Sequence, residues 1–190
     1  TRFNNRKSQS GTDAFDVKPE DHENDKKEEK QGDGEDENSN TNNTVTDLNA
    51  KLNCVISLAN WARNPSNAAR LAQEGGIRAI ITLTQEQDTR ILKYCSAAFR
   101  FMSEIPLLAN AMIDEGAVSA ISDVVKVPVD EFASTNLAVA LVNLTRINGK
   151  EAYLVEGSMV LALQNIIMNR SELSSLCSRG LYNLTCVDGM

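Results

Sequence analysis

From Val45 onward, apolar and polar positions alternate with the period of an α-helix, and the same arrangement recurs along the chain. A Glu-Gly dipeptide marks the recurrence at residues 74–75, 115–116 and 156–157, so that both intervals are 41 residues. A short apolar stretch precedes each dipeptide, and a second one follows it. The pattern predicts pairs of short helices joined by a sharp turn.

Each pair is followed by a longer apolar run with a shared ending. The four copies of this ending are residues 58–61, 99–102, 141–144 and 181–184, at intervals of 41, 42 and 40 residues. The residues that occupy the same place in these copies are called matching positions below. The run predicts a long third helix in each unit, and its first copy has no short pair before it.

Glycine and proline mark the predicted boundaries. Glycine tolerates the left-handed backbone that ends many helices, so each Glu-Gly is expected to form a helix-to-helix turn. Pro65, Pro106 and Pro128 stand where helices begin or connect. The predicted elements are a lone helix over 45–62 and three-helix units over about 65–104, 106–146 and 148–187.

The period and the three-helix unit resemble the armadillo repeat, the family of β-catenin and importin-α. The segments that carry the resemblance are NPSNAARLAQEGGIRAIITL, IPLLANAMIDEGAVSAISDVV and TNLAVALVNLT. The resemblance implies an all-α protein of eukaryotic origin, a right-handed α-solenoid of about three and a half armadillo repeats. HEAT repeats are similar, but they have two helices and lack this glycine turn.

Charge divides the chain into two parts. Residues 1–43 hold 7 Lys/Arg against 12 Asp/Glu, a net charge of −5, whereas residues 44–190 have a net charge of −2. The first part has too few apolar residues to offset the entropy of ordering, so a disordered acidic low-complexity tail is predicted there. Residues 44–190 are the predicted repeat domain.

The remaining composition excludes several classes of function. The repeat domain is not basic enough for nucleic acid, and no apolar stretch is long enough to span a membrane. The one histidine, His22, lies in the tail, and no CxxC pair or phosphate-binding loop occurs. We therefore expect no enzyme activity, no catalytic residues, no metal and no cofactor.

The cysteines suit a core better than a disulfide framework. Cys54, Cys95 and Cys177 occupy one matching position with Leu137, which is typical of a small buried hydrophobe. Trp61 shares its position with methionine and leucine, so it too is expected in the core. Unpaired buried thiols agree with a reducing compartment, cytoplasm or nucleus.

Candidate binding residues lie on the long third helices. In the armadillo family these helices line a concave groove, where an asparagine holds the backbone of an extended peptide. The matching positions here are Asn60, Phe101, Asn143 and Asn183. An amide offers two donors and an acceptor to a peptide group. Alternatively, these asparagines satisfy local backbone groups. Further candidates on the same helix face are Asn53, Tyr94, Asn136, Arg63, Arg146 and Arg179.

The arginines predict a mildly basic groove for acidic or phosphorylated segments, because guanidinium pairs with carboxylate and phosphate through two bonds. The alternative is that these arginines are solvated charges at helix ends, where they stabilise the terminal carbonyls. Importin-like binding is disfavoured, because Ile56, Ala97, Val139 and Arg179 stand where its groove carries tryptophan. The acidic segment 20–37 is a candidate for contact with the groove in the same molecule, although a solubilising linker is the simpler interpretation.

Two functions follow from these observations. The chain is expected to be an interaction scaffold that binds an extended peptide of an unknown protein partner. The alternative is an architectural segment of a longer solenoid in a cytoskeletal or ciliary assembly. Both chain ends look like cuts in a longer protein, and leucines of the last helix are expected to leave an apolar end that favours self-association.

Overall fold

The fold is described from a computed structural model of the chain. The structure describes residues 38–186, with side chains for residues 44–186 except residue 68. Contacts divide the chain into two units, Thr1–Asp36 and Glu37–Met190, and the described residues all belong to the second. The predicted acidic tail and its proposed contact with the groove therefore lie almost wholly outside the described residues.

All regular structure in residues 38–186 is helical. A long helix, α1, comes first and three units of three helices follow it, as the sequence pattern predicts. Short 3₁₀ turns at Thr84–Glu86 and Ser171–Leu173 precede the third helix of the first and last units. The helices are α1 (Asn38–Ala62); α2 (Pro65–Gln73), α3 (Gly76–Leu83) and α4 (Thr89–Ser103); α5 (Pro106–Asp114), α6 (Ala117–Val124) and α7 (Glu131–Leu144); α8 (Glu151–Glu156), α9 (Met159–Asn169) and α10 (Ser174–Thr185).

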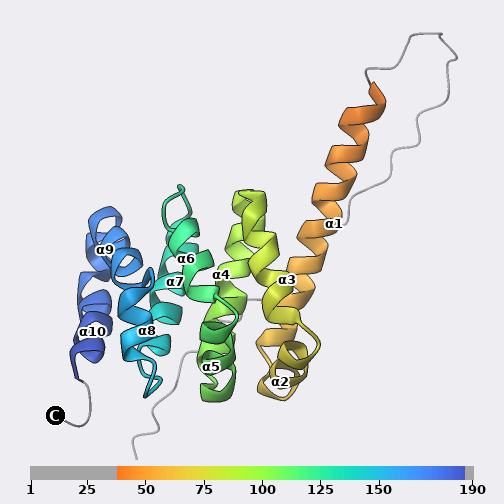
Figure 1. Ribbon diagram of the computed structural model, residues 1–190. Coiled ribbons are helices and arrows are strands. Elements are labelled where there is room, and N and C mark those ends of the chain that lie inside the picture. Colours follow the sequence, from red (N-terminus) through yellow and green to blue (C-terminus); the bar gives the residue numbers. More distant parts are fainter. Residues whose placement is uncertain (1–37, 187–190) are drawn as a thin grey trace, which may run out of the picture. The chain divides into compact units, whose positions relative to one another are not determined.

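The units stack in sequence order, and equivalent helices pack in rows. Helix α1 packs on α4, α4 on α7 and α7 on α10, while α3, α6 and α9 form a second row. Figure 1 shows α1 and α10 at opposite ends of the stack. The third helices therefore bring their matching positions side by side.

Side-chain caps explain where several helices begin. Asn64 Oδ1 accepts a hydrogen bond from the Ser66 N–H at 3.0 Å, with Pro65 as the first residue of α2. Asp88 and Asp130 cap the third helices α4 and α7 in the same way. Each cap satisfies an N–H that the helix itself leaves unpaired.

The glycine turns differ between units. Gly75 and Gly116 have φ of 84° and 85°, the left-handed conformation predicted for them. Gly157 has φ −78° and ψ −164°, so the left-handed conformation expected in the third unit is wrong, although the chain still turns there between α8 and α9. Helix α8 is shorter than α2 and α5, and the positive φ in this unit falls instead at Gly149, before α8.

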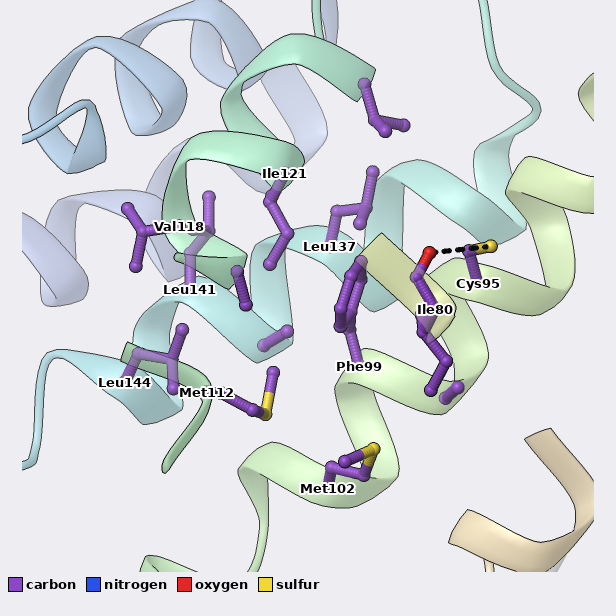
Figure 2. Close-up of a cluster of buried hydrophobic side chains, with 14 of the residues drawn as sticks. Ile80, Cys95, Phe99, Met102, Met112, Val118, Ile121, Leu137, Leu141 and Leu144 are labelled. Atoms are coloured by element: carbon purple, nitrogen blue, oxygen red, sulfur yellow. Dashed lines mark hydrogen bonds between the residues drawn. The ribbon is translucent and has the colours of Figure 1, made fainter. Parts of the chain in front are cut away.

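The core runs through the stack between the third helices and the short pairs. Figure 2 shows Phe99 of α4 surrounded by side chains from α3, α6 and α7, including Ile121 and Leu137. All three of these side chains are at most 1 % exposed. The Cys95 thiol lies 3.8 Å from the Ile80 carbonyl oxygen of α3. Burial removes apolar surface from water and is the main stabilising term for such a stack.

Two residues of α1 differ from their expected burial. Cys95 and Cys177 are buried, as predicted, but Cys54 is exposed. Trp61 is 48 % exposed, whereas Met102 and Leu144, at its matching positions, are fully buried. Cys95 is covered by α3 of its own unit, and within the described residues no short helix pair precedes α1. The expectation that Cys54 and Trp61 are core residues is therefore wrong.

Helix α1 also begins earlier than predicted. It starts at Asn38, seven residues before Val45. The added segment, residues 38–44, is entirely polar and contains no strong helix former.

Candidate functional site

The candidate residues lie along the row α1, α4, α7 and α10. Asn143 and Asn183 are half-exposed. Each is hydrogen-bonded to the preceding helix of this row, Asn143 to α4 and Asn183 to the end of α7. The Asn143 Nδ2 donates to Ser103 Oγ at 3.1 Å, and the Asn183 Nδ2 donates to Thr145 Oγ1 at 3.0 Å. These hydroxyls in turn donate to carbonyls of their own helices, at 2.7 Å in both cases.

These bonds position the amides without using them up. A primary amide has two N–H donors and an acceptor oxygen, and each bond takes one donor. Within the described residues, neither Asn143 nor Asn183 uses its Oδ1 or its second N–H. The partners are side-chain hydroxyls of the neighbouring repeat rather than the local backbone groups of the alternative interpretation. The groove interpretation stays a prediction.

Asn136 is placed differently from the expectation. It is 2 % exposed and lies between α4 and α7. Its Nδ2 donates to Ser96 Oγ at 3.5 Å, and its Oδ1 accepts from Arg100 Nη1 at 3.2 Å. A buried polar group needs such partners, and its amide is not available to a peptide in this arrangement.

Phe101 interrupts the row of amides, as its sequence position indicates. It is half-buried and packs against the core, as does Tyr94. The hydroxyl partner is missing as well, because Ala62 stands where Ser103 and Thr145 stand in later repeats. The amide and its hydroxyl are therefore both absent at the junction of α1 and α4.

At the first end of the row, Asn53, Asn60 and Arg63 are exposed on or just after α1. They share matching positions with Asn136, Asn143 and Arg146. Because no helix precedes α1 in the described part of the chain, Asn53 and Asn60 have no neighbour like Ser96 or Ser103.

Charges are distributed unevenly along the row. Arg100 pairs with Glu104 at 3.5 Å, and Lys93 pairs with Asp130 at 3.3 Å. Arg146 and Arg179 are exposed, and neither forms an ion pair with another described residue. Among the described residues, positive charge without an ion-pair partner therefore lies beside Asn143 and Asn183, whereas Lys93 and Arg100 of α4 are paired.

A hollow of about 490 Å³ lies between α4 and α7. Arg100, Asn136 and Thr135 line one part of it, and Asp130, Glu131 and Phe132 line the rest. The Lys93 ammonium lies 5.4 Å from the centre of the Phe132 ring, a cation–π contact. The hollow is large enough for one side chain of a bound segment.

The titratable groups do not form a reactive cluster. Among the described residues, no group of three or more His, Cys, Asp or Glu side chains could hold a metal ion. Burial raises the pKa of the Cys95 thiol to about 12 and that of Cys177 to about 11, which makes both poor nucleophiles. The pKa of Asp88 is lowered by its hydrogen bond with Arg90, but this carboxylate caps α4.

Comparison with known proteins adds a structural match. No family model and no curated protein sequence matches the chain. The designed armadillo repeat protein YIII(Dq)4CqI is similar in structure, with a TM-score of 0.61, 20 % identity and 70 % of this chain covered. The chain has an armadillo-type repeat fold. It spans 58 % of the designed protein.

The residues that hold the armadillo-type row together were not predicted from the sequence. Ser96, Ser103 and Thr145 accept from asparagines of the next repeat, and Arg100 joins Asn136 to Glu104. A signal was present, because a hydroxyl residue stands two positions after three of the four matching residues: Ser103 after Phe101, Thr145 after Asn143 and Thr185 after Asn183, but Ala62 after Asn60. It could not be interpreted without knowing which helix lies next to which.

No helix of the described residues combines the length and apolar character needed to cross a membrane. The longest, α1, is largely polar over its first turns.

Proposed function

We propose that this armadillo-type repeat protein binds an extended acidic or phosphorylated segment of another protein along α7 and α10. The observation that carries the proposal is that Asn143 and Asn183 lie on the same row as Arg146 and Arg179, two arginines that form no ion pair within the described part of the chain. The two amides are preset by bonds to the preceding repeat, so little side-chain entropy is lost when they bind.

The chemistry of the four side chains suits such a segment. The free Oδ1 of each asparagine accepts from a peptide N–H, and its second N–H donates to a peptide carbonyl. These contacts hold the backbone whatever its side chains are. The guanidinium groups then select carboxylate or phosphate, because each can make two parallel charge-assisted bonds.

A lysine-rich ligand fits this surface poorly. Arg179 is exposed and would repel lysine. Ala97 is 6 % exposed, so it offers no aromatic surface for a lysine stem. We propose the cytoplasm or nucleus as the site of action, in keeping with the unpaired thiols.

Binding of labelled peptides to the full chain tests the proposal. Acidic and phosphorylated peptides are expected to bind, and lysine-rich peptides of the same length are not. Asn143→Ala combined with Asn183→Ala is expected to weaken binding of all peptides, because it removes backbone contacts. Arg179→Gln is expected to weaken the binding of acidic peptides selectively, by about tenfold if one charged hydrogen bond is lost.

Arg70→Gln is the matched control. It changes the net charge by the same amount, but Arg70 lies on α2, outside the row of third helices. If Arg70→Gln and Arg179→Gln weaken binding equally, general charge attraction rather than a groove accounts for the affinity. Binding that is indifferent to both asparagines contradicts the proposal.

An architectural role is the second candidate, and exposed apolar side chains at the ends of the stack favour it. Trp61 near the start and Tyr153, Met168 and Tyr182 in the last unit are all at least 48 % exposed. Of the leucines expected to leave an apolar end, Leu184 is 6 % exposed, and Leu173, Leu176 and Leu181 are partly buried against the core. Absence of peptide binding together with self-association would favour this role.

A further inference from the structure

The interface between α4 and α7 has a specific pattern of polar contacts. Two asparagines of α7, seven residues apart, donate to two serines of α4 that are also seven residues apart. Asn136 donates to Ser96 at 3.5 Å, and Asn143 donates to Ser103 at 3.1 Å. The interface between α7 and α10 repeats the second contact, from Asn183 to Thr145 at 3.0 Å.

Helix α1 has the donor half of this pattern. Asn53 and Asn60 occupy the matching positions of Asn136 and Asn143, with the same spacing, and both are exposed. Within residues 44–186 their side chains make no hydrogen bond. Between them, Ser57 is exposed where Ala98, Ala140 and Gly180 are buried in the later repeats.

Helix α10 has the acceptor half. Ser178 and Thr185 occupy the matching positions of Ser96 and Ser103, and both are exposed. Thr185 Oγ1 donates to the Tyr182 carbonyl at 2.8 Å, just as Ser103 Oγ donates to the Arg100 carbonyl at 2.7 Å. The oxygen of Thr185 is thus oriented as in the internal interface.

Tyr182 stands between these two hydroxyl residues and is 67 % exposed. Its matching residue on α7, Val142, packs on the next helix: a Cβ added to Gly180 would lie 3.1 Å from Val142 Cγ2. Ser57 matches Gly180, so the position that receives this side chain is open on α1. Beside it lies a hollow of about 340 Å³, lined by Ser57, Cys54, Leu58, Trp61 and residues of α2 and α3.

We propose that α10 of a second copy of this chain stacks on α1, in the register of the α4–α7 interface. Asn53 and Asn60 then donate to Ser178 and Thr185 of the second copy, and Tyr182 of the second copy enters the hollow beside Ser57. Each chain carries both halves at opposite ends of the stack (Figure 1). The contact is head-to-tail, so copies add in a line and the row of third helices continues from one copy to the next.

Sedimentation of the full chain over a range of concentrations tests this contact. The wild-type chain is expected to form oligomers that grow with concentration. Ser57→Arg blocks the α1 end, and Tyr182→Arg blocks the α10 end, so each variant alone is expected to stay monomeric. Both positions are exposed, and circular dichroism verifies that the helices are retained. Leu107→Arg, a 72 % exposed position on α5 away from both ends of the stack, is the matched control and is expected to associate normally.

A mixture of the two blocked variants decides the geometry. Ser57→Arg keeps a working α10 end and Tyr182→Arg keeps a working α1 end, so their mixture is expected to form a dimer and nothing larger. A monomeric wild-type chain at all concentrations overturns the proposal. A loss of association with Ser57→Arg but not with Tyr182→Arg also overturns it, because that result indicates contact between two α1 helices.

The register has its own test. Two double variants remove the two hydrogen bonds from either side: Asn53→Ala with Asn60→Ala, and Ser178→Ala with Thr185→Ala. Each double variant is expected to weaken association by about tenfold to a hundredfold, the loss of two net hydrogen bonds. Combining all four substitutions should weaken it no further, because both pairs remove the same two bonds. Additive losses contradict the pairing. Peptide binding through Asn143 and Asn183 is measured separately and does not enter these outcomes.

Discussion

The middle and the beginning of this stack contain the same kinds of residue in different surroundings. Phe99 on α4 is fully buried, whereas Leu58, at the matching position on α1, is partly exposed. Likewise, Asn136 on α7 is 2 % exposed, whereas Asn53, its match on α1, is exposed. The residue types are similar, so the difference comes from the neighbouring helices. In a solenoid, each repeat depends on the repeats beside it for burial.

The comparison also separates two uses of one residue type. Asn143 and Asn183 donate to the preceding repeat and keep groups for a ligand, whereas Asn136 is 2 % exposed and makes both of its bonds within the stack. A row of similar side chains therefore need not form one continuous binding surface. The position of each amide relative to the preceding helix decides its role.

The largest expected effect is in the core. Phe99→Ala should lower the free energy of unfolding by about 3–5 kcal/mol, because a fully buried ring leaves a cavity. Leu58→Ala, at the matching position on α1, should cost clearly less. Urea unfolding followed by circular dichroism measures both. If Phe99→Ala does not fold, Phe99→Leu provides a smaller change for the same comparison, and equal losses at both positions would contradict it.

A smaller effect is expected from the buried amide. Asn136→Ala should lower the free energy of unfolding by about 1–3 kcal/mol, because Arg100 and Ser96 lose a buried partner. Asn53→Ala should change stability by no more than about 0.5 kcal/mol under dilute conditions, since its side chain is exposed. Thermal and urea unfolding at low protein concentration compare the two. A large loss from Asn53→Ala would show that α1 is covered even in the isolated chain.

The glycine turns sharpen the comparison within the stack. Gly116→Ala should lower the free energy of unfolding by about 1–2 kcal/mol, because a residue with a Cβ disfavours φ of 85°. The cost is conformational, since no atom lies within 4 Å of the added Cβ. Gly157→Ala should cost less, since its backbone is extended, even with the Tyr153 carbonyl oxygen 3.1 Å from the added Cβ. Equal costs from urea unfolding would mean that the third turn is left-handed in solution.

The thiols provide the mildest test. Cys54 and Cys186 should react quickly with a thiol reagent, and Cys95 and Cys177 only as the protein unfolds. Burial raises the pKa of Cys95 from 9.0 to about 12, so the unfolded chain loses this proton first. Stability should therefore fall as pH rises above about 9. Fast reaction at four thiols in the folded protein would contradict the buried positions.

Much of the fold could be predicted from the sequence because its signals are local. The Glu-Gly dipeptides, the prolines at 65 and 106 and the apolar period each act within one or two turns of helix. They predicted the three-helix units, and the structural match confirms the armadillo-type fold. The departure at Gly157 shows the limit, because the same dipeptide there precedes a different backbone.

The candidate site depended on information that is not local. Nothing near Asn143 in the sequence indicates that its partner is Ser103, 40 residues earlier, or that Asn136 is buried by α4.

The sequence by itself determined the repeat period, the helices and the turns, because backbone conformation depends on nearby residues. Only the tertiary structure decided that Cys95 is buried and Cys54 exposed, and that Arg146 and Arg179 form no ion pair with the residues the structure describes. Burial and pairing depend on what packs against a residue, and in a stack of repeats identical positions can have different neighbours.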